Sequence, residues 1–273
     1  MELDLAAEVA QWPVDSASVA VVDRDGIVAM YDDKQRHRWA SVTKIASSLT
    51  ILDGCAEGVI SLDDPLGPPG ATLRHLLAHA SGLSPDSDES AFGVERRRVY
   101  SDRGIDLAAE HLAHATGQEF RQELDDRVLE LLDLDDTEFV GRPAHGMVGP
   151  ITDLAALARE LLEPQLLLPQ VVAMASTIAY PGLDGVLPGF GLQRPNDWGL
   201  GFEIRGHKSP HWTAPENSPA TFGHFGQAGS FLWVDREAEV ACVSLSDRAF
   251  GKWAARVWPP LSSKVLSAYG RAR

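Results

Sequence analysis

The sequence predicts an α+β fold in which both ends of the chain form one antiparallel sheet flanked by helices. Two observations lead to this prediction. Strand-like apolar runs cluster near the two ends, at residues 18–23, 27–31, 198–204, 229–234 and 240–245. The stretch between them has mostly helical periodicity. We therefore expect a sheet subdomain made of residues 1–58 and 195–273, with residues 59–194 as a largely helical subdomain inserted between its halves.

Local signals define the individual elements. Asp25-Gly26 joins the first two strand-like runs and is a strong hairpin signal. Helices are expected at residues 3–12, 41–57, 72–77, 106–116, 118–132, 152–162, 171–177 and 252–269. The last helix contains Pro259-Pro260, which should break or kink it. The polar residues 84–98 and 206–220 are expected to form loops.

Composition excludes several classes of partner. The chain has 273 residues, of which 44% are hydrophobic and 23% charged, as in a globular protein of one large domain or two closely packed subdomains. Its formal net charge of −15 opposes binding to nucleic acid or to an anionic membrane surface. No stretch approaches the length of a membrane span, and residues 1–9 lack the features of a signal peptide. We therefore expect a cytoplasmic protein, and we leave its oligomeric state open.

No metal or cofactor site is predicted. His75 and His79 are four residues apart, but the glutamate of a His-Glu-x-x-His motif is absent and no carboxylate pattern completes a site. The sequence also lacks the glycine-rich loops that bind nucleotide phosphates and the Gly-x-Ser-x-Gly turn of α/β-hydrolases. Cys55 and Cys242 are too few for a disulfide framework, and both are expected to be buried thiols.

Ser41 and Lys44 form the most informative short motif. Ser41 is expected in the first turn of the helix that stops near Gly58, and Lys44 lies one turn later on the same face. A serine hydroxyl is a weak nucleophile until a nearby base accepts its proton. A lysine amine can be that base if desolvation or neighbouring cations lower its pKa. The motif alone is weak, because a capping serine followed by a solvated lysine gives the same pattern.

Further segments, in a fixed order, give this motif its context. The segments are Ser41-Val42-Thr43-Lys44, Leu62-Asp63-Asp64-Pro65, Leu76-Leu77-Ala78-His79-Ala80-Ser81-Gly82-Leu83, Tyr100-Ser101-Asp102 and His224-Phe225-Gly226. Together they resemble the serine β-lactamase-like superfamily, in the branch of class C β-lactamases, DD-peptidases and esterases. The resemblance covers about residues 17–250 and implies the β-lactamase/transpeptidase-like form of the α+β fold.

The resemblance also implies a role for each matched residue. Ser41 would be the acylated nucleophile, and Lys44 would be the base or would keep the base deprotonated through its charge. Tyr100 would carry the proton to the leaving group, with its pKa lowered by Lys44. The backbone N–H groups of Ser41 and Gln227 would form the oxyanion hole. Gly226 would allow the substrate to approach the backbone closely.

Two residues depart from the β-lactamase pattern. His224 stands where β-lactamases have a lysine, as in esterase-like members. Asp102 replaces an asparagine that hydrogen-bonds an amide of the substrate, and an ionised carboxylate cannot donate that bond. We therefore expect a serine hydrolase whose substrates are small esters or amides. The alternatives left open are a penicillin-binding, weak β-lactamase or DD-peptidase-like activity, and an inactive relative that binds a ligand without turnover.

Overall fold

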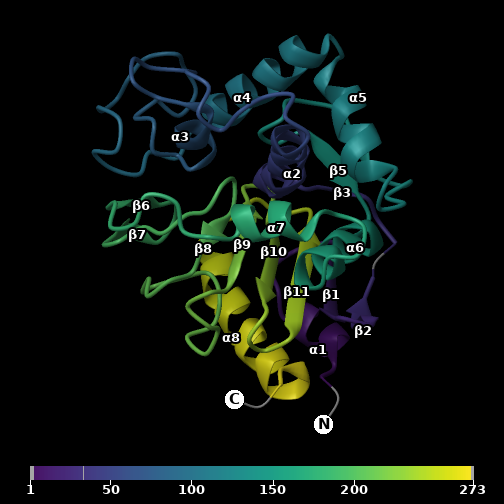
Figure 1. Cartoon of the computed structure of the whole chain (residues 1–273). Coiled ribbons are helices and arrows are strands. Elements are labelled where there is room, and N and C mark those ends of the chain that lie inside the picture. Colours follow the sequence, from purple (N-terminus) through teal and green to yellow (C-terminus); the bar gives the residue numbers. More distant parts are fainter. Residues whose placement is uncertain (1–2, 33, 272–273) are drawn as a thin grey trace.

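A six-stranded antiparallel sheet lies at the centre of the computed structural model, which describes residues 3–32 and 34–271 (Figure 1). Met1, Glu2, Ala272 and Arg273 of the predicted sheet subdomain lie outside the described residues, as does Asp33. The strand order is β2-β1-β11-β10-β9-β8. The strands are β1 Ala17–Asp23, β2 Gly26–Tyr31, β8 Glu203–Ile204, β9 Phe222–Gly226, β10 Ser230–Asp235 and β11 Val240–Ser246. Because β1 pairs directly with β11, the sheet joins the two ends of the chain and the predicted α+β class is confirmed.

The helices and smaller sheets surround this centre. The helices are α1 Leu5–Val9, α2 Thr43–Ala56, α3 Leu73–Leu77, α4 Asp102–Thr116, α5 Phe120–Leu124, α6 Ile151–Leu162, α7 Pro169–Ala175 and α8 Lys252–Tyr269. A 3-10 turn, Ala40–Val42, precedes α2, and a π-helical turn, Asp125–Leu129, follows α5. The short strands are β3 His37–Arg38, β4 Glu138–Phe139, β5 Met147–Gly149, β6 Gly185–Leu187 and β7 Gly191–Gln193.

Both faces of the central sheet are buried except at the edge strand β2, which explains why the other strands are apolar almost throughout. Val19 and Val21 of β1 belong to the core under α1 and α8, whereas Ala20 and Val22 belong to the core under α2 and α6. This alternation follows from the opposite directions of successive side chains in a strand. Figure 1 shows α8, in yellow, on one side of the sheet and α6 on the other.

The helix α6 belongs by sequence to the predicted helical insertion, yet it packs against β1 and β11. It therefore covers a face of the sheet, while α4 packs on α2 and α3 further from it. The predicted boundaries after residues 58 and 194 stay a prediction. Within the described residues, no helix is both long and apolar enough to cross a bilayer.

Several local predictions differ from the structure. The strand expected at residues 198–204 is limited to β8, and the helix expected at residues 118–132 is α5 followed by the π-helical turn. The helix expected from residue 106 begins at Asp102, because the Ser101 hydroxyl caps it by accepting the Gly104 N–H at 3.1 Å. The predicted break at Pro259-Pro260 is wrong: α8 continues through the pair, whose neighbours Trp258 and Leu261 are buried on the sheet. Cys242 is buried as expected, but Cys55 is only partly buried at the end of α2, and both are free thiols.

Candidate active site

Ser41 lies in the 3-10 turn that leads into α2, one turn earlier than the predicted position inside the helix. The residue before it, Ala40, has a φ of +47°, a left-handed conformation that is strained for a residue with a Cβ. Neighbouring strands hold this turn in place. The Ser230 hydroxyl of β10 donates to the Trp39 carbonyl at 2.7 Å, and the Trp39 N–H donates to Met147 of β5 at 2.9 Å. The strained turn is therefore fixed from both sides.

Lys44 is completely buried beneath Ser41. Its Nζ atom lies 3.2 Å from Ser41 Oγ, 2.7 Å from the Ala144 carbonyl oxygen and 2.7 Å from Asp102 Oδ1. Burial lowers the pKa of Lys44, and the negative charge of Asp102 opposes that effect without cancelling it. Asp102 thus raises the pKa of Lys44, but desolvation outweighs this effect and the net shift is downward.

The sequence did not predict that the segment around Ala144 contributes to the site. It is bound to the nucleophile helix where the Met147 N–H donates to Thr43 Oγ1 at 3.1 Å. It is bound to α4 where the Ala144 N–H donates to Asp106 Oδ1 at 3.1 Å. These contacts fix a carbonyl acceptor against the Lys44 amine. The pattern Gly-Arg-Pro-Ala-His around it gives no sequence signal for such a role.

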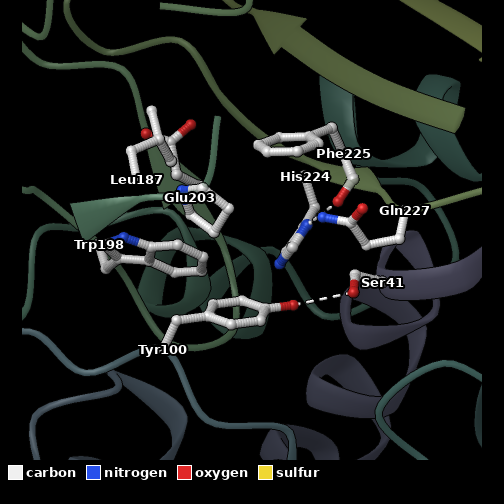
Figure 2. Close-up of a pocket in the computed structure, with 9 residues that line it drawn as sticks. Ser41, Tyr100, Leu187, Trp198, Glu203, His224, Phe225 and Gln227 are labelled. Atoms are coloured by element: carbon white, nitrogen blue, oxygen red, sulfur yellow. Dashed lines mark hydrogen bonds between the residues drawn. The ribbon is translucent and has the colours of Figure 1, made fainter. Parts of the chain in front are cut away.

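Tyr100 completes the contacts of the nucleophile. Its hydroxyl donates to Ser41 Oγ at 2.9 Å, as Figure 2 shows, and its ring lies 4.9 Å from Lys44 Nζ. Burial, and then the charge of Asp102, raise the pKa of Tyr100 well above its ordinary value. The predicted lowering of this pKa by Lys44 is therefore wrong, and Tyr100 is a neutral phenol with a proton to donate.

His79 belongs to one of the ordered segments that carry the resemblance, but no role was predicted for it. In the structure it packs against Tyr100. Its Nδ1 accepts the Ser101 N–H at 3.2 Å, and its ring packs 4.7 Å from the rings of Tyr100 and Trp198. Burial lowers the pKa of His79 well below its usual range, so the ring is neutral. His75 contacts Thr72 and Glu95. Within residues 3–32 and 34–271, no three His, Cys, Asp or Glu side chains are grouped to hold a metal ion.

Asp102 is the first residue of α4 and does not cap it, since Ser101 does. Its carboxylate points to Lys44, and its side chain is 22% exposed. It does not belong to the lining of the cavity beside Ser41. A direct contact between Asp102 and a substrate stays a prediction, whereas its electrostatic contact with Lys44 is present in the structure.

His224 lies inside β9, the strand before β10. Its Nδ1 is 2.6 Å from the Phe225 carbonyl oxygen, and its buried Nε2 has no hydrogen-bond partner among the described residues. Burial, reinforced by the nearby charge of Lys44, lowers the pKa of His224 to about 3. The ring packs against both Tyr100, at 5.7 Å, and Trp198, at 5.4 Å, which also contact each other. His224 is thus neutral at ordinary pH, unlike the lysine of the β-lactamase pattern.

Gly226 is required by a contact within the chain. A Cβ at this position would lie 2.4 Å from Ser230 Oγ and 2.6 Å from the Trp39 carbonyl oxygen. The absence of a side chain therefore lets β9 approach the turn that carries Ser41, which is a different reason from the predicted approach of substrate. Gln227 follows directly and lines the cavity.

A small cavity opens beside Ser41, with a volume of about 30 Å³. By the usual measure this holds about two water-sized groups. Its lining consists of Ser41, Tyr100, Leu187, Pro188, Trp198, Glu203, His224, Phe225 and Gln227 (Figure 2). Five residues of this lining were not predicted as site residues: Leu187, Pro188, Trp198, Glu203 and Phe225. Nothing in their local sequence marks them as neighbours of Ser41.

Glu203 reaches this lining from a buried charged cluster. Its carboxylate contacts Lys208, accepts the Trp212 indole N–H at 2.9 Å and lies 3.0 Å from His211 Nε2. Burial alone would raise the pKa of Glu203, but Lys208 and His211 together lower it far below its usual range. The Lys208 ammonium also donates to the Asp197 carbonyl at 2.7 Å, next to Trp198. The cluster therefore holds the wall of the cavity in place.

A wider groove of about 340 Å³ adjoins the small cavity, and the two share Tyr100 and Pro188. Its lining includes Phe92 and Val186, which are 43% and 54% exposed. The guanidinium of Arg97 lies 5.0 Å from the centre of the Phe92 ring. The groove is thus largely apolar, with two arginines, Arg97 and the buried Arg98, in its wall.

Comparisons with known proteins agree with this geometry. The sequence model of the family described as Beta-lactamase matches residues 5–265. No curated protein matches the chain. The crystal structure of a beta-lactamase from Mycobacterium bovis (Mb2281c) is 46% identical with a TM-score of 0.95, over 97% of this chain and 99% of that one.

Two more distant structures share the fold. Simvastatin synthase (LovD) from Aspergillus terreus, in a LovD6 mutant, is 16% identical with a TM-score of 0.78, over 97% of this chain and 93% of that one. EstCE1, a hydrolase with promiscuous acyltransferase activity, is 17% identical with a TM-score of 0.77, over 97% of this chain and 96% of that one. These matches confirm the resemblance that the ordered motifs predicted.

Proposed function

Because the chain belongs to the Beta-lactamase family, we propose that it is a serine hydrolase that cleaves small esters or amides through an acyl-enzyme on Ser41. One observation carries this proposal. Ser41 Oγ is contacted by two groups that can move protons, Lys44 Nζ at 3.2 Å and the Tyr100 hydroxyl at 2.9 Å. The serine also lines a cavity. A hydroxyl in this setting is an activated nucleophile, not a helix cap.

Acylation begins when the neutral amine of Lys44 accepts the Ser41 proton and Oγ bonds to the substrate carbonyl carbon. The bond to the leaving oxygen or nitrogen then breaks. Tyr100 gives its hydroxyl proton to the leaving atom and regains one from the Lys44 ammonium, so that charge and protons balance. Deacylation runs the same transfers with water as the nucleophile, which releases the acid and restores the Ser41 hydroxyl.

The backbone N–H groups of Ser41 and Gln227 would stabilise the negative oxygen that forms during both steps. Both residues line the same cavity. The close approach at Gly226 supports this assignment, because it fixes the strand end that carries Gln227 against the turn that carries Ser41. Such donors act best when their positions are set before the reaction.

The leaving group would occupy the side of the site where Tyr100 stands, since Tyr100 protonates it. That side contains the small cavity and, beyond Pro188, the wider apolar groove. An ester whose alcohol portion is short, or which extends along the groove as an apolar group, fits this shape. The proposed substrates are therefore small molecules of that kind.

A second candidate is β-lactam hydrolysis, which is favoured by the 46% identity to the Mycobacterium bovis protein described as a beta-lactamase. Two features argue for esters instead. The Asp102 carboxylate offers only acceptors to a β-lactam side chain. His224, neutral because burial lowers its pKa to about 3, brings no positive charge to the position of the β-lactamase lysine.

Burst kinetics test the proposal and its alternatives. With p-nitrophenyl acetate we expect a burst of p-nitrophenol equal to the enzyme concentration, followed by slower turnover. Nitrocefin hydrolysis measured on the same preparation compares the two substrate classes. A higher kcat/KM for nitrocefin would reject the ester assignment in favour of the second candidate. The absence of both burst and turnover, with the fold intact, would indicate an inactive relative.

A further inference from the structure

The imidazole of His224 contains a buried polar atom that the proposed reaction does not use. Its Nε2 atom has no hydrogen-bond partner among the described residues, and the whole residue is 4% exposed. The ring borders the cavity beside Ser41 and contacts the rings of Tyr100 and Trp198 (Figure 2). A buried polar atom without a partner is costly, so a partner is expected when the site is filled.

The other ring nitrogen determines what kind of partner is needed. Nδ1 lies 2.6 Å from the Phe225 carbonyl oxygen, which has no hydrogen to donate. Nδ1 therefore carries the hydrogen of the ring and donates it to Phe225. In a neutral imidazole the remaining nitrogen is then a bare acceptor. Burial and the Lys44 charge keep the ring neutral, since they lower the pKa of His224 to about 3.

Most nearby protein donors are already engaged, and the Trp198 indole N–H, which has no partner among the described residues, does not hydrogen-bond Nε2. The Tyr100 hydroxyl donates to Ser41 Oγ, and the Trp212 indole N–H donates to Glu203. The Lys44 ammonium is directed to Ser41, Ala144 and Asp102. The acceptor at Nε2 is thus left for a molecule that enters the cavity.

We propose that His224 Nε2 accepts a hydrogen bond from an uncharged donor on the leaving group, so that the enzyme selects esters whose alcohol portion carries a second hydroxyl or an N–H. This inference rests on the proposed hydrolase function. The leaving group stands against Tyr100, and the ring of His224 lies 5.7 Å from the ring of Tyr100. The cavity holds about two water-sized groups beside Ser41, so the donor lies within two or three atoms of the scissile bond.

The same acceptor disfavours anionic leaving groups. A carboxylate at this position would face the lone pair of Nε2 and would find no donor there. The site therefore separates three esters that differ at one position: a hydroxyl is preferred, a methyl group is tolerated, and a carboxylate is rejected. A water molecule held by Nε2 is the competing explanation for the unpartnered atom, and it predicts no such preference.

The test uses 2-hydroxyethyl acetate, propyl acetate and acetoxyacetate, which all give the same acetyl-enzyme. Differences in kcat/KM, corrected for the rate of hydroxide-catalysed hydrolysis of each ester, then report only on recognition of the leaving group. We expect the 2-hydroxyethyl ester to exceed the propyl ester by about tenfold, the size of one hydrogen bond in a buried site. Acetoxyacetate should be slower than both.

Two matched variants assign the effect to His224. His224→Gln keeps an acceptor at a similar reach and should keep the hydroxyl preference, whereas His224→Met has a similar volume without it and should bring the ratio close to one. A ratio near one in the unmodified enzyme, or a tenfold preference that survives in His224→Met, would overturn the inference. The inference would also be overturned if His224→Met lowered kcat/KM equally for both esters and left their ratio unchanged. That outcome would indicate that Nε2 binds water.

A second measurement is independent of turnover. In Ser41→Ala, the ¹⁵N resonance of His224 Nε2 should be that of a bare acceptor and should shift on addition of 2-hydroxyethyl acetate but not of propyl acetate. A protonated Nε2, or the same response to both esters, would contradict the inference. If p-nitrophenyl acetate is not hydrolysed at all, the proposed function fails, and this measurement still decides the role of His224.

Discussion

Lys44 Nζ lies 2.7 Å from Asp102 Oδ1, and this contact opposes the effect of burial on the same amine. Burial lowers the pKa of Lys44, while Asp102 raises it. In the proposed reaction the neutral amine is the active form, so the rate rises with pH as Lys44 loses its proton. Asp102→Asn should therefore lower the pKa of Lys44 further. The rising, acidic limb of the plot of kcat/KM against pH should then move to lower pH. Profiles for p-nitrophenyl acetate measure the shift.

Asp88→Asn is a matched control for this change. Asp88 pairs with Arg103, near the same end of α4, but its side chain is 72% exposed and does not contact Lys44. The two variants alter net charge equally, so the pH limb should move only in Asp102→Asn. An unchanged limb there, or the same movement in both, would mean that Asp102 does not tune the base. Asp102→Asn should also raise nitrocefin hydrolysis relative to ester hydrolysis, because an amide adds a donor.

Substitution of Lys44 should abolish acylation. Lys44→Met removes the base and keeps most of the volume, so kcat/KM for esters should fall by at least about 100-fold. Lys44 is completely buried. Lys44→Ala should therefore also destabilise the protein, by more than about 2 kcal/mol, because it leaves a cavity beside an unpaired Asp102. Urea unfolding of both variants measures the difference, and turnover retained in a folded Lys44→Met would identify another base.

Gly226→Ala should disrupt the site without reaching any reacting atom. Its Cβ would lie 2.6 Å from the Trp39 carbonyl oxygen, so β9 would have to move away from the turn that carries Ser41. We expect kcat to fall by about 100-fold or more, as when one oxyanion donor is misplaced. Gly251→Ala is the control, since its backbone is extended and its new Cβ would meet only Trp253, at 3.9 Å. Equal activity in the two variants would show that the contact at Gly226 is not needed.

Glu203→Gln tests the buried cluster through stability. It leaves Lys208 without its carboxylate and should cost about 3–5 kcal/mol at pH 7. The folded pKa of Glu203 lies below its ordinary value of 4.5, so the stabilisation is present above that pH and is lost as the pH falls below it. The difference in unfolding free energy between the unmodified protein and Glu203→Gln should therefore decrease from pH 7 to pH 3. Urea unfolding measures this difference. The exposed control Glu239→Gln should change stability by no more than about 1 kcal/mol, and a difference that is constant with pH would reject the ionic account.

The sheet and its two-ended origin were predictable because periodicity is a local property. The apolar run of β1 and the Asp25-Gly26 turn are readable from neighbouring residues, and both are present in the structure. The start of α4 and the course of α8 through Pro259-Pro260 were less predictable. The first depends on the Ser101 cap, and the continuity of the second depends on burial of Trp258 on a sheet that the sequence does not display.

The site was predictable where the chain itself brings groups together. Ser41 and Lys44 are neighbours by helical spacing, whereas Ala144 and Trp198 reach the site only through the fold. Charge states were the least predictable part. The pKa of Tyr100 is raised by burial and then by the charge of Asp102, and the extent of burial is not a property of the sequence motif.

The central claim is that Ser41 carries the acyl group. The most direct measurement is the intact mass of the protein after reaction with a fluorophosphonate, followed by peptide mapping. We predict one adduct per chain, located on the peptide that contains Ser41, and no adduct on Ser41→Ala under the same conditions. An adduct of equal yield on Ser41→Ala, or an adduct mapped to another residue in the unmodified protein, would contradict the account.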